Sequence, residues 1–403
     1  MTRTKFVQIH FLTPFPASLL NRDDAGMAKR IPFGGTSRIR ISSQCLKRHW
    51  RTASGEHSLA GLGIEMSVRS KRIFDELIAE PLIKEGLDPG VVRRVTKALQ
   101  DEVLGKSEKA AAQKTQDSND KNDTLETKQV IILGKPEIEF LKTCVRELAR
   151  KDNSTDHARV VKDYLNDKDR RKNLDALKKG ASAGLDAALF GRMVTSDILA
   201  RGDAAIHVAH AFTVHQEEAE IDFFSAVDDL AVATGELGSG HINESELTSG
   251  LYYGYAVVDI PLLVSNLEGV PRDQWEQAPR KLASRVVERL IHLIATVSPG
   301  AKRGSTAPYS YADLMLVETG SSQPRTLANA FLDPVRADAP GGLRRAAVNA
   351  LSRHLEAYDR MYQTGESRGY ACLIDETQIP AEKMESLHSL ALWAAAKVHG
   401  EKP

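Results

Sequence analysis

The first fifty residues alternate between apolar and polar positions in two short runs, which a turn-rich segment separates. Residues 5–12 alternate and are rich in β-branched and aromatic side chains, which predicts a strand. Residues 13–35 contain three Pro and three Gly and predict a long exposed loop. Residues 37–41 alternate strictly, so their isoleucines are expected to face a core while Arg38 and Arg40 point the other way.

Helical patterns replace this alternation from residue 58 onward. Apolar positions recur at helical spacing in residues 70–82, 90–99 and 137–151. Between the last two, residues 105–128 are highly polar and have almost nothing to bury, which predicts a disordered loop. We therefore expect a helical insertion over residues 58–180.

Strand-like segments return after residue 180. Residues 204–216 and 251–260 predict strands, and the segment between them is acidic and punctuated by glycines. Later patterns predict a strand over 315–318 and helices over 278–298, 342–359 and 380–399. The sum is an α+β fold: a sheet domain in three parts (1–57, 181–215 and 251–403), interrupted by the helical insertion (58–180) and by an acidic excursion (216–250).

The composition is typical of a globular chain without a membrane segment. Of the 403 residues, 42% are hydrophobic and 27% charged, and no apolar run approaches the roughly 20 residues that span a bilayer. The N-terminus alternates like a strand and lacks the apolar core of a signal peptide. Cys45, Cys144 and Cys372 are far apart and odd in number, which favours a reducing cytoplasm over a disulfide framework or a zinc site.

Charge is distributed unevenly along the chain, although the formal net charge is zero. Residues 1–51 hold ten Lys or Arg against two acids, whereas residues 202–271 hold no Lys or Arg and many acids. A basic segment can hold a polyanion, and an acidic one can dock on the basic surface of another copy. The alternative is that both segments are solvated faces that balance each other, and charge alone leaves the two interpretations equal.

The helix expected after the second strand carries the most chemistry. Ser42 or Ser43 would cap it, and the free amide groups of a helix N-terminus attract anions near Gln44. Lys47 and Arg51 lie four residues apart on one face, with Arg48 beside them. Such a helix can grip successive phosphates of one strand; a capped surface helix with ordinary solvated cations is nearly as good an interpretation.

Two other residue sets suggest metal chemistry. His207, His210 and His215 invite a metal site, but along a strand they do not share one side, so core or surface histidines are the better prediction. Asp23 and Asp24 could bind Mg²⁺ and cleave a phosphodiester, yet the flanking Asn and Arg suggest pairing within the loop equally well.

Aromatic and basic positions further along also suit an RNA strand. Phe223 and Phe224 lie in the acidic excursion and either anchor it to the core or stack on unpaired bases. Met193, which follows Gly191-Arg192, could equally well pack in a core. Lys302 and Arg303 lie in a glycine-bearing loop that is suited to phosphate contact.

Long collinear motifs resemble one known family. They begin with NRDD, FGG and RIRISSQCLKR in the first fifty residues and continue with LFGRMVTSD, HAFTVHQ, IDFFSAVDDL, SGLYYGYAVVDI, SPGAKRGS and LANAF. These motifs resemble the CasC-type (Cas-seven family) backbone subunit of the type I-E CRISPR Cascade complex. They span nearly the whole chain, with the helical insertion as the least recognisable part.

The resemblance implies an RRM-like (ferredoxin-like) palm with a helical finger insertion and a thumb. By position in the motifs, it assigns the grip on the guide backbone to Arg22, Lys29, Ser42, Gln44, Lys47 and Arg51. Met193 would lie against the bases, and Phe223 and Phe224 would lie on the thumb, where close relatives carry Trp in place of the first. Arg48, Lys302 and Arg303 are added as RNA-binding residues on local chemistry.

The implied function is non-catalytic, without cofactor or metal. Similar proteins polymerise head to tail along a CRISPR RNA, in the cytoplasm, with other Cascade subunits, and hold the guide for pairing with target DNA. The acidic thumb, including Asp228 and Asp229, would dock on the next copy. One rival is a Mg²⁺-dependent ribonuclease of the type III kind that uses Asp23 or Asp24; another is a hydrolase that uses a metal held by the histidines.

Overall fold

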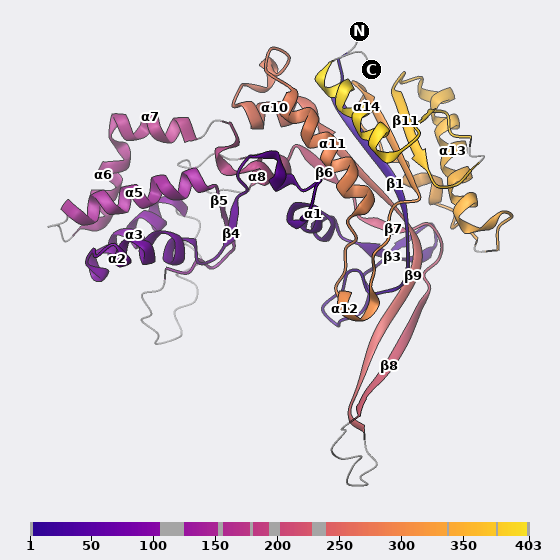
Figure 1. The fold of residues 1–403 in the computed structure, drawn as a ribbon, viewed down its shortest axis with the longest axis horizontal. Coiled ribbons are helices and arrows are strands. Elements are labelled where there is room, and N and C mark those ends of the chain that lie inside the picture. Colours follow the sequence, from indigo (N-terminus) through magenta and orange to yellow (C-terminus); the bar gives the residue numbers. More distant parts are fainter. Residues whose placement is uncertain are drawn as a thin grey trace. The chain divides into compact units, whose positions relative to one another are not determined.

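The computed structural model describes residues 3–104, 125–151, 156–177, 180–192, 202–227, 239–336, 338–375 and 378–400. The chain divides into two compact units, which are both drawn in Figure 1. We call Met1–Leu59, His207–Asp259 and Ser284–Pro403 the sheet unit, and Ala60–Ile206 with Ile260–Ala283 the helical unit. None of the helices described is long and apolar enough to cross a membrane.

A mostly antiparallel sheet organises the sheet unit. Its main path among the described residues is β12-β11-β10-β1-β9-β7-β3-β2, and β6 and β8 pair with β9 outside this path. At the centre, Ile9 of β1 lies opposite Val317 of β10 on one side and Ala256 of β9 on the other. The strands are β1 (Phe6–Ser18), β2 (Arg30–Phe33), β3 (Thr36–Ile41), β6 (Ile206–Val208), β7 (Ala211–Thr213), β8 (Ala219–Val227), β9 (Ser239–Asp259), β10 (Leu314–Gly320), β11 (Ser367–Cys372) and β12 (Glu382–Lys383).

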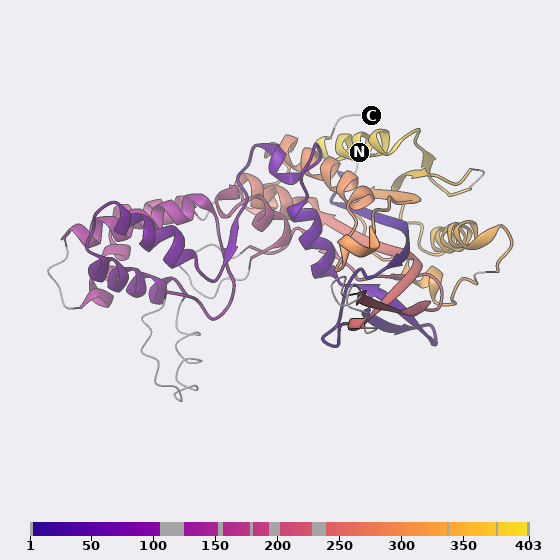
Figure 2. The same cartoon turned by 60° about the horizontal axis from the view of Figure 1, so that its bottom comes forward.

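Both faces of this sheet are covered by helices, as Figures 1 and 2 show. On one face, α13 (Gly342–Tyr362) packs through Leu351 and Leu355 on Leu316 and Tyr253. On the other face lie α1 (Ser43–Thr52), α11 (Lys281–Thr296) and α14 (Leu387–His399). Because both faces are buried, β10 begins with a continuous apolar run, and even the polar Gln8 and His10 of β1 are buried.

Strands β8 and β9 continue past the sheet as a two-stranded hairpin (Figure 1). The pairing of β9 with β1 reaches as far as Thr248, opposite Ser18, whereas residues 239–248 of β9 pair with β8. The acidic excursion expected from the sequence is therefore largely an extended ladder, and one 21-residue strand serves both the sheet and the hairpin.

Two local predictions about the first fifty residues need correction. Strand β1 continues to Ser18 and β2 covers Arg30–Phe33, so much of the expected loop over residues 13–35 is sheet. Past Leu12, β1 has no pairing with β10, so the prolines at 14 and 16 occupy a stretch with one open side, where a missing N–H is tolerated. Arg38 is fully buried rather than pointing away from a core, because the sheet is covered on both faces.

The helical unit has a separate apolar core. Residues such as Ile78, Leu99, Leu141 and Val145 are each fully buried in it. Its helices include α2 (Glu80–Lys84), α3 (Pro89–Leu104), α5 (Lys135–Lys151), α6 (His157–Asn166), α7 (Lys168–Leu177), α8 (Leu185–Phe190) and α10 (Ile260–Glu268), and β4 (Val68–Ser70) pairs with β5 (Ile131–Leu133).

This unit is larger than the insertion expected over residues 58–180. It also takes in residues 181–206 and 260–283, which the sequence analysis assigned to the sheet domain. The reason is tertiary: Asn266 of α10 donates hydrogen bonds to the carbonyls of Ala188 (2.8 Å) and Asp203 (3.0 Å), so distant segments join. Residues 105–124 of the polar tract over 105–128 lie outside the described residues; at its described end, Leu125 and Thr127 are buried.

Candidate nucleic-acid interface

Helix α1 begins where the sequence predicts, and its N-terminus is tied to the preceding loop. Ser42 is the N-cap, and its hydroxyl accepts a hydrogen bond from the Cys45 amide (3.3 Å). The Ser42 amide in turn donates to the side-chain oxygen of Asn21 (2.8 Å). Asn21 also accepts a backbone hydrogen bond from Lys29 (2.9 Å), so one residue joins the helix start to both ends of the loop that carries Arg22 and Lys29.

Cations from three segments gather around the first turns of α1. Lys29 from the loop, Arg48 from the helix and Arg303 from the loop before β10 all lie close enough to Cys45 to act on its thiol electrostatically. Burial nevertheless raises the pKa of Cys45 to about 11, against the three cations that favour the thiolate. The thiol therefore stays protonated and is not a reactive group. The electrostatic effect of the three cations on it shows that they lie nearby.

The loop before β10 is tied to the residue that follows β1 and is braced by a contact of its own. The amide of Ala301 donates to the carbonyl of Leu19 (3.0 Å), and Arg303 donates to the carbonyl of Ser298 (2.9 Å). Lys302 and Arg303 open the short helix α12 (Arg303–Thr306). Residues that are some 250–280 positions apart in the sequence thus lie around Cys45 of α1.

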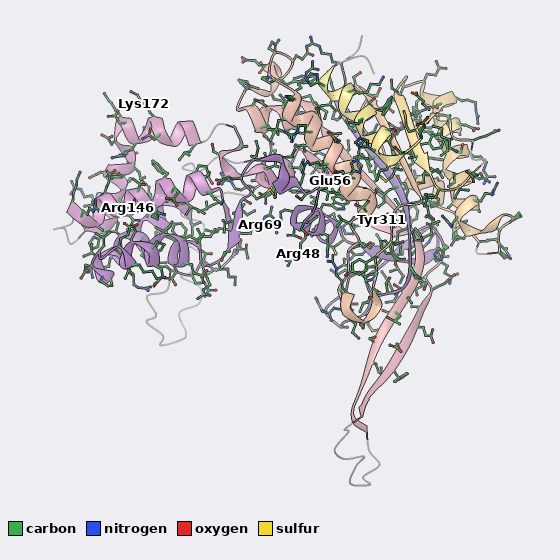
Figure 3. All side chains as sticks on the ribbon, in the orientation of Figure 1. Arg48, Glu56, Arg69, Arg146, Lys172 and Tyr311 are labelled. Atoms are coloured by element: carbon green, nitrogen blue, oxygen red, sulfur yellow. The ribbon has the colours of Figure 1, made fainter. Side chains whose placement is uncertain are left out.

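The cations differ in exposure. Arg48 is exposed and is labelled on α1 in Figure 3, while Lys47 is half-buried and burial lowers its pKa. Arg22 is exposed, and Lys29 and Arg51 are half-buried. Within the part of the chain that the structure describes, Arg22, Lys29, Lys47, Arg48 and Arg303 form no ion pair with a carboxylate, so their charge is available to a ligand.

Two members of this surface, Arg40 and His210, were not predicted from the sequence. Arg40 donates to Nδ1 of His210 (3.0 Å), and both lie beside Lys29, since burial and then Arg40 and Lys29 lower the pKa of His210. Alternation along β3 already placed Arg40 away from the core, which was a usable signal. The position of His210 depends on β7 pairing with β3 and had no local signal.

His207 and His215 do not belong to the cationic surface around α1. His215 is buried, with Nδ1 against the Gln216 carbonyl (2.7 Å) and Nε2 accepting from the Leu251 amide (3.2 Å), so it ties strands together. His207 is exposed on β6. No group of three or more His, Cys, Asp or Glu placed to hold a metal ion occurs among the described residues.

Asp23 closes the loop between Asn21 and Lys29. One of its carboxylate oxygens accepts from the amides of Ala25 (3.0 Å) and Met27 (2.9 Å), and its amide donates to the Met27 carbonyl (2.8 Å). This is the side-chain-to-backbone pattern of a turn-forming Asp. Asp24 is exposed beside it.

The hairpin carries exposed apolar side chains on one face. Ile221 and Phe223 are two residues apart on β8 and are 49% and 66% exposed, which a core-anchoring role does not explain. The backbone of Phe224 pairs with that of Asn243 of β9. Its side chain, and the whole of Met193, Asp228 and Asp229, lie outside the described residues.

A separate cleft of about 560 Å³ lies between the end of α11, the start of β10 and the segments around Leu373 and Met384. Its wall includes the exposed Tyr311, labelled in Figure 3, and the carboxylates of Asp313, Asp375 and Glu385. The predicted RNA-binding residues that the structure describes do not line it. Its acidic groups disfavour a phosphate backbone.

Comparisons with known proteins agree with the sequence motifs. One solved chain, from a CRISPR RNA-guided surveillance complex in a pre-nicking state, matches with a TM-score of 0.78 and 28% identity, over 98% of this chain and 100% of that one. Another, from a CRISPR RNA-guided surveillance complex, matches with a TM-score of 0.68 over 97% and 99% of the two chains; at 24% identity it supports the fold alone. No curated protein matches the sequence.

The CT1975-like protein family matches residues 7–395, nearly the whole chain. Together with the structural likeness, this match confirms the predicted resemblance to Cas-seven-type backbone subunits of CRISPR complexes. The chain belongs to the CT1975-like protein family.

Proposed function

We propose that the chain binds the backbone of a single-stranded CRISPR guide RNA on the surface around α1. The observation that carries this proposal is the convergence of Lys29, Arg48 and Arg303 on one half-buried thiol, from three separate segments and without carboxylate partners among the described residues. A protein whose formal net charge is zero has no general excess of cations. Their concentration without counter-charges at one surface therefore favours a polyanionic ligand.

The N-terminus of α1 adds hydrogen-bond donors to these charges. The amides of Ser42 and Cys45 are already bound within the protein, and the first-turn amides of Ser43 and Gln44 are the ones that point toward a ligand. Phosphate contacts of this kind fix the register of a strand without selecting its sequence. Such a surface suits a subunit that must hold any guide.

The hairpin is proposed to engage the next copy of the chain and the RNA that it holds. The exposed Phe223 supports this assignment, because an aromatic side chain without a core partner can stack on an unpaired base. In this proposal the sheet unit is the palm, the hairpin the thumb and the helical unit the finger domain, and copies assemble head to tail as in a type I-E complex with its other subunits. Target DNA is recognised by pairing with the guide, and the protein itself performs no catalysis.

Purification from the native cell tests this proposal. The protein should carry small RNA of uniform length, released by high salt, and should form particles whose mass rises in equal steps with guide length. Protein that purifies free of RNA from cells that contain a CRISPR array, and that fails to bind added guide RNA, would contradict the proposal.

The ribonuclease alternative has a distinct outcome. Incubation of the RNA-bound protein with Mg²⁺ and complementary RNA should leave the RNA intact, because the Asp23 carboxylate is held in a turn by two amides. Periodic cleavage that disappears in Asp23→Ala or Asp24→Ala would replace the scaffold function with a nuclease.

A further inference from the structure

A buried carboxylate belonging to the hairpin holds the loop that carries Arg22 and Lys29. Glu246 lies on β9 just before the pairing with β1 begins, opposite Ile221 of β8. It is 4% exposed, whereas Glu244, two residues earlier on the same face, is exposed. Burying a carboxylate costs folding free energy unless the charge is paired, so the contacts of Glu246 indicate its structural role.

Both oxygens of Glu246 are used. Oε2 accepts from the amide of Ala28 (2.5 Å), and Arg30 donates to both Oε2 (3.4 Å) and Oε1. Arg30 also donates to the carbonyl of Ala28 (2.9 Å), so the side chains of this pair bind the amide and the carbonyl of one residue.

Ala28 occupies a sensitive position in the loop. It pairs with Arg22 in an isolated β-bridge and directly precedes Lys29. A shift of its backbone would therefore move the backbone at both cations. The contact spans 218 residues of sequence and links the hairpin strand to the candidate RNA surface.

A second carboxylate at the hairpin base completes the link. Glu217 accepts from Nε of Arg30 (2.7 Å) and from the hydroxyl of Ser37 (2.8 Å). Arg30 thus joins the loop to β9 and to the segment just before β8, and it is not available to a ligand, in contrast to Lys29 next to it.

We propose that Glu246, through Ala28 and Arg30, is a positioning residue that holds the 22–29 loop in the conformation that binds RNA. This inference rests on the proposed function. It makes a prediction that electrostatics alone does not: removing this acid should weaken RNA binding, although removing a negative charge near a polyanion site ordinarily strengthens it.

The decisive variant keeps the charge. Glu246→Asp is shorter by one methylene and cannot reach both Ala28 and Arg30, and we expect it to weaken guide RNA binding about tenfold, the loss expected for one hydrogen bond to a buried amide. The slope of affinity against salt should stay unchanged, because no cation is removed. Glu244→Asp is the matched control, since it makes the same change on the same strand face, and should bind like the wild type.

Glu246→Gln adds a second readout. Its amide oxygen can still accept from Ala28, so it should bind RNA more tightly than Glu246→Leu, which loses both contacts. Equal affinity of Glu246→Asp and the wild type, or tighter binding by Glu246→Leu, would overturn the positioning role.

Hydrogen exchange separates this inference from the proposed function. In RNA-free protein, peptides covering residues 22–30 should exchange faster in Glu246→Asp than in Glu244→Asp, while the thermal midpoints of the two variants stay close. Unchanged exchange would reject the positioning role even if the wild type binds RNA. Faster exchange in a protein that binds no RNA would reject the proposed function and leave the structural link intact.

Discussion

The salt dependence of RNA binding tests the candidate surface most directly. Lys29, Arg48 and Arg303 converge on Cys45 and have no carboxylate partner among the described residues, so each is available to one phosphate. For single strands, each neutralised phosphate contributes about 0.7 to the slope of log affinity against log salt. Replacing all three with Ala should therefore lower the slope by about 2.

The difference in slope can be measured as a ratio of RNA affinities when the salt concentration is raised fourfold. Between 50 and 200 mM salt, wild-type affinity should fall roughly 20-fold further than that of the triple variant. Fluorescence anisotropy with a labelled guide RNA at several salt concentrations measures both slopes. Arg336→Ala is a charge control, because Arg336 is exposed, is paired with Asp338 (2.8 Å) and lies outside the surface.

Two results would refute this reasoning. One is a triple variant whose slope equals that of the wild type. The other is an Arg336→Ala variant whose slope falls as far per charge as that of the triple variant, since the effect would then reflect net charge rather than a defined surface. A melting temperature close to that of the wild type is required of every variant.

Four further predictions follow from particular contacts. Glu318 is fully buried and is bound by His10, Arg325 and Arg368; burial raises its pKa but these partners lower it further, so the network stabilises the fold above about pH 4.3 and loses this as the pH falls. Glu318→Gln should cost ~3–5 kcal/mol in urea unfolding at pH 7, and a loss under 1 kcal/mol would contradict this account. Gly34→Ala should unfold at a clearly lower temperature than Gly35→Ala, because a Cβ at Gly34 would lie 1.5 Å from the Leu332 carbonyl oxygen while that at Gly35 meets open space; equal midpoints would refute it. Phe223→Ala should change stability by less than ~0.5 kcal/mol yet weaken assembly on RNA, and a large loss of stability would instead indicate core anchoring. Burial and then His57 and His388 lower the pKa of His292 to about 4, so stability should fall as the pH drops from about 6.5 toward 4, and His292→Leu should flatten that fall in a pH series of melting temperatures.

Features that depend on neighbouring residues could be predicted from the sequence. The Ser42 cap, the helix after it and the placement of Lys47 and Arg48 follow from local propensity and helical spacing, and the structure has them. The family was also accessible, because its motifs are collinear over the whole chain.

Features that depend on tertiary pairing could not be predicted from the sequence. Alternation predicted that Arg38 points away from a core, but its guanidinium is buried and donates to the carbonyls of Thr213 (2.9 Å) and Phe331 (3.1 Å). No local pattern shows that both faces of a strand are covered. The ion pairs of Arg30 with Glu217 and Glu246 span about 190 and 220 residues and were equally inaccessible.

The continuity of β9 also limits how the hairpin can change in evolution. Residues 239–247 extend beyond the pairing with β1, a reach of about 30 Å at the ordinary rise of a strand. Inserting one residue in each strand would turn every side chain beyond it to the opposite face, moving Phe223 away from its present side. Lengths that differ by two residues per strand keep the face and change the reach by about 7 Å. Homologous hairpins should therefore differ in length by even steps, and a subunit with a longer hairpin should space its neighbours differently along the guide.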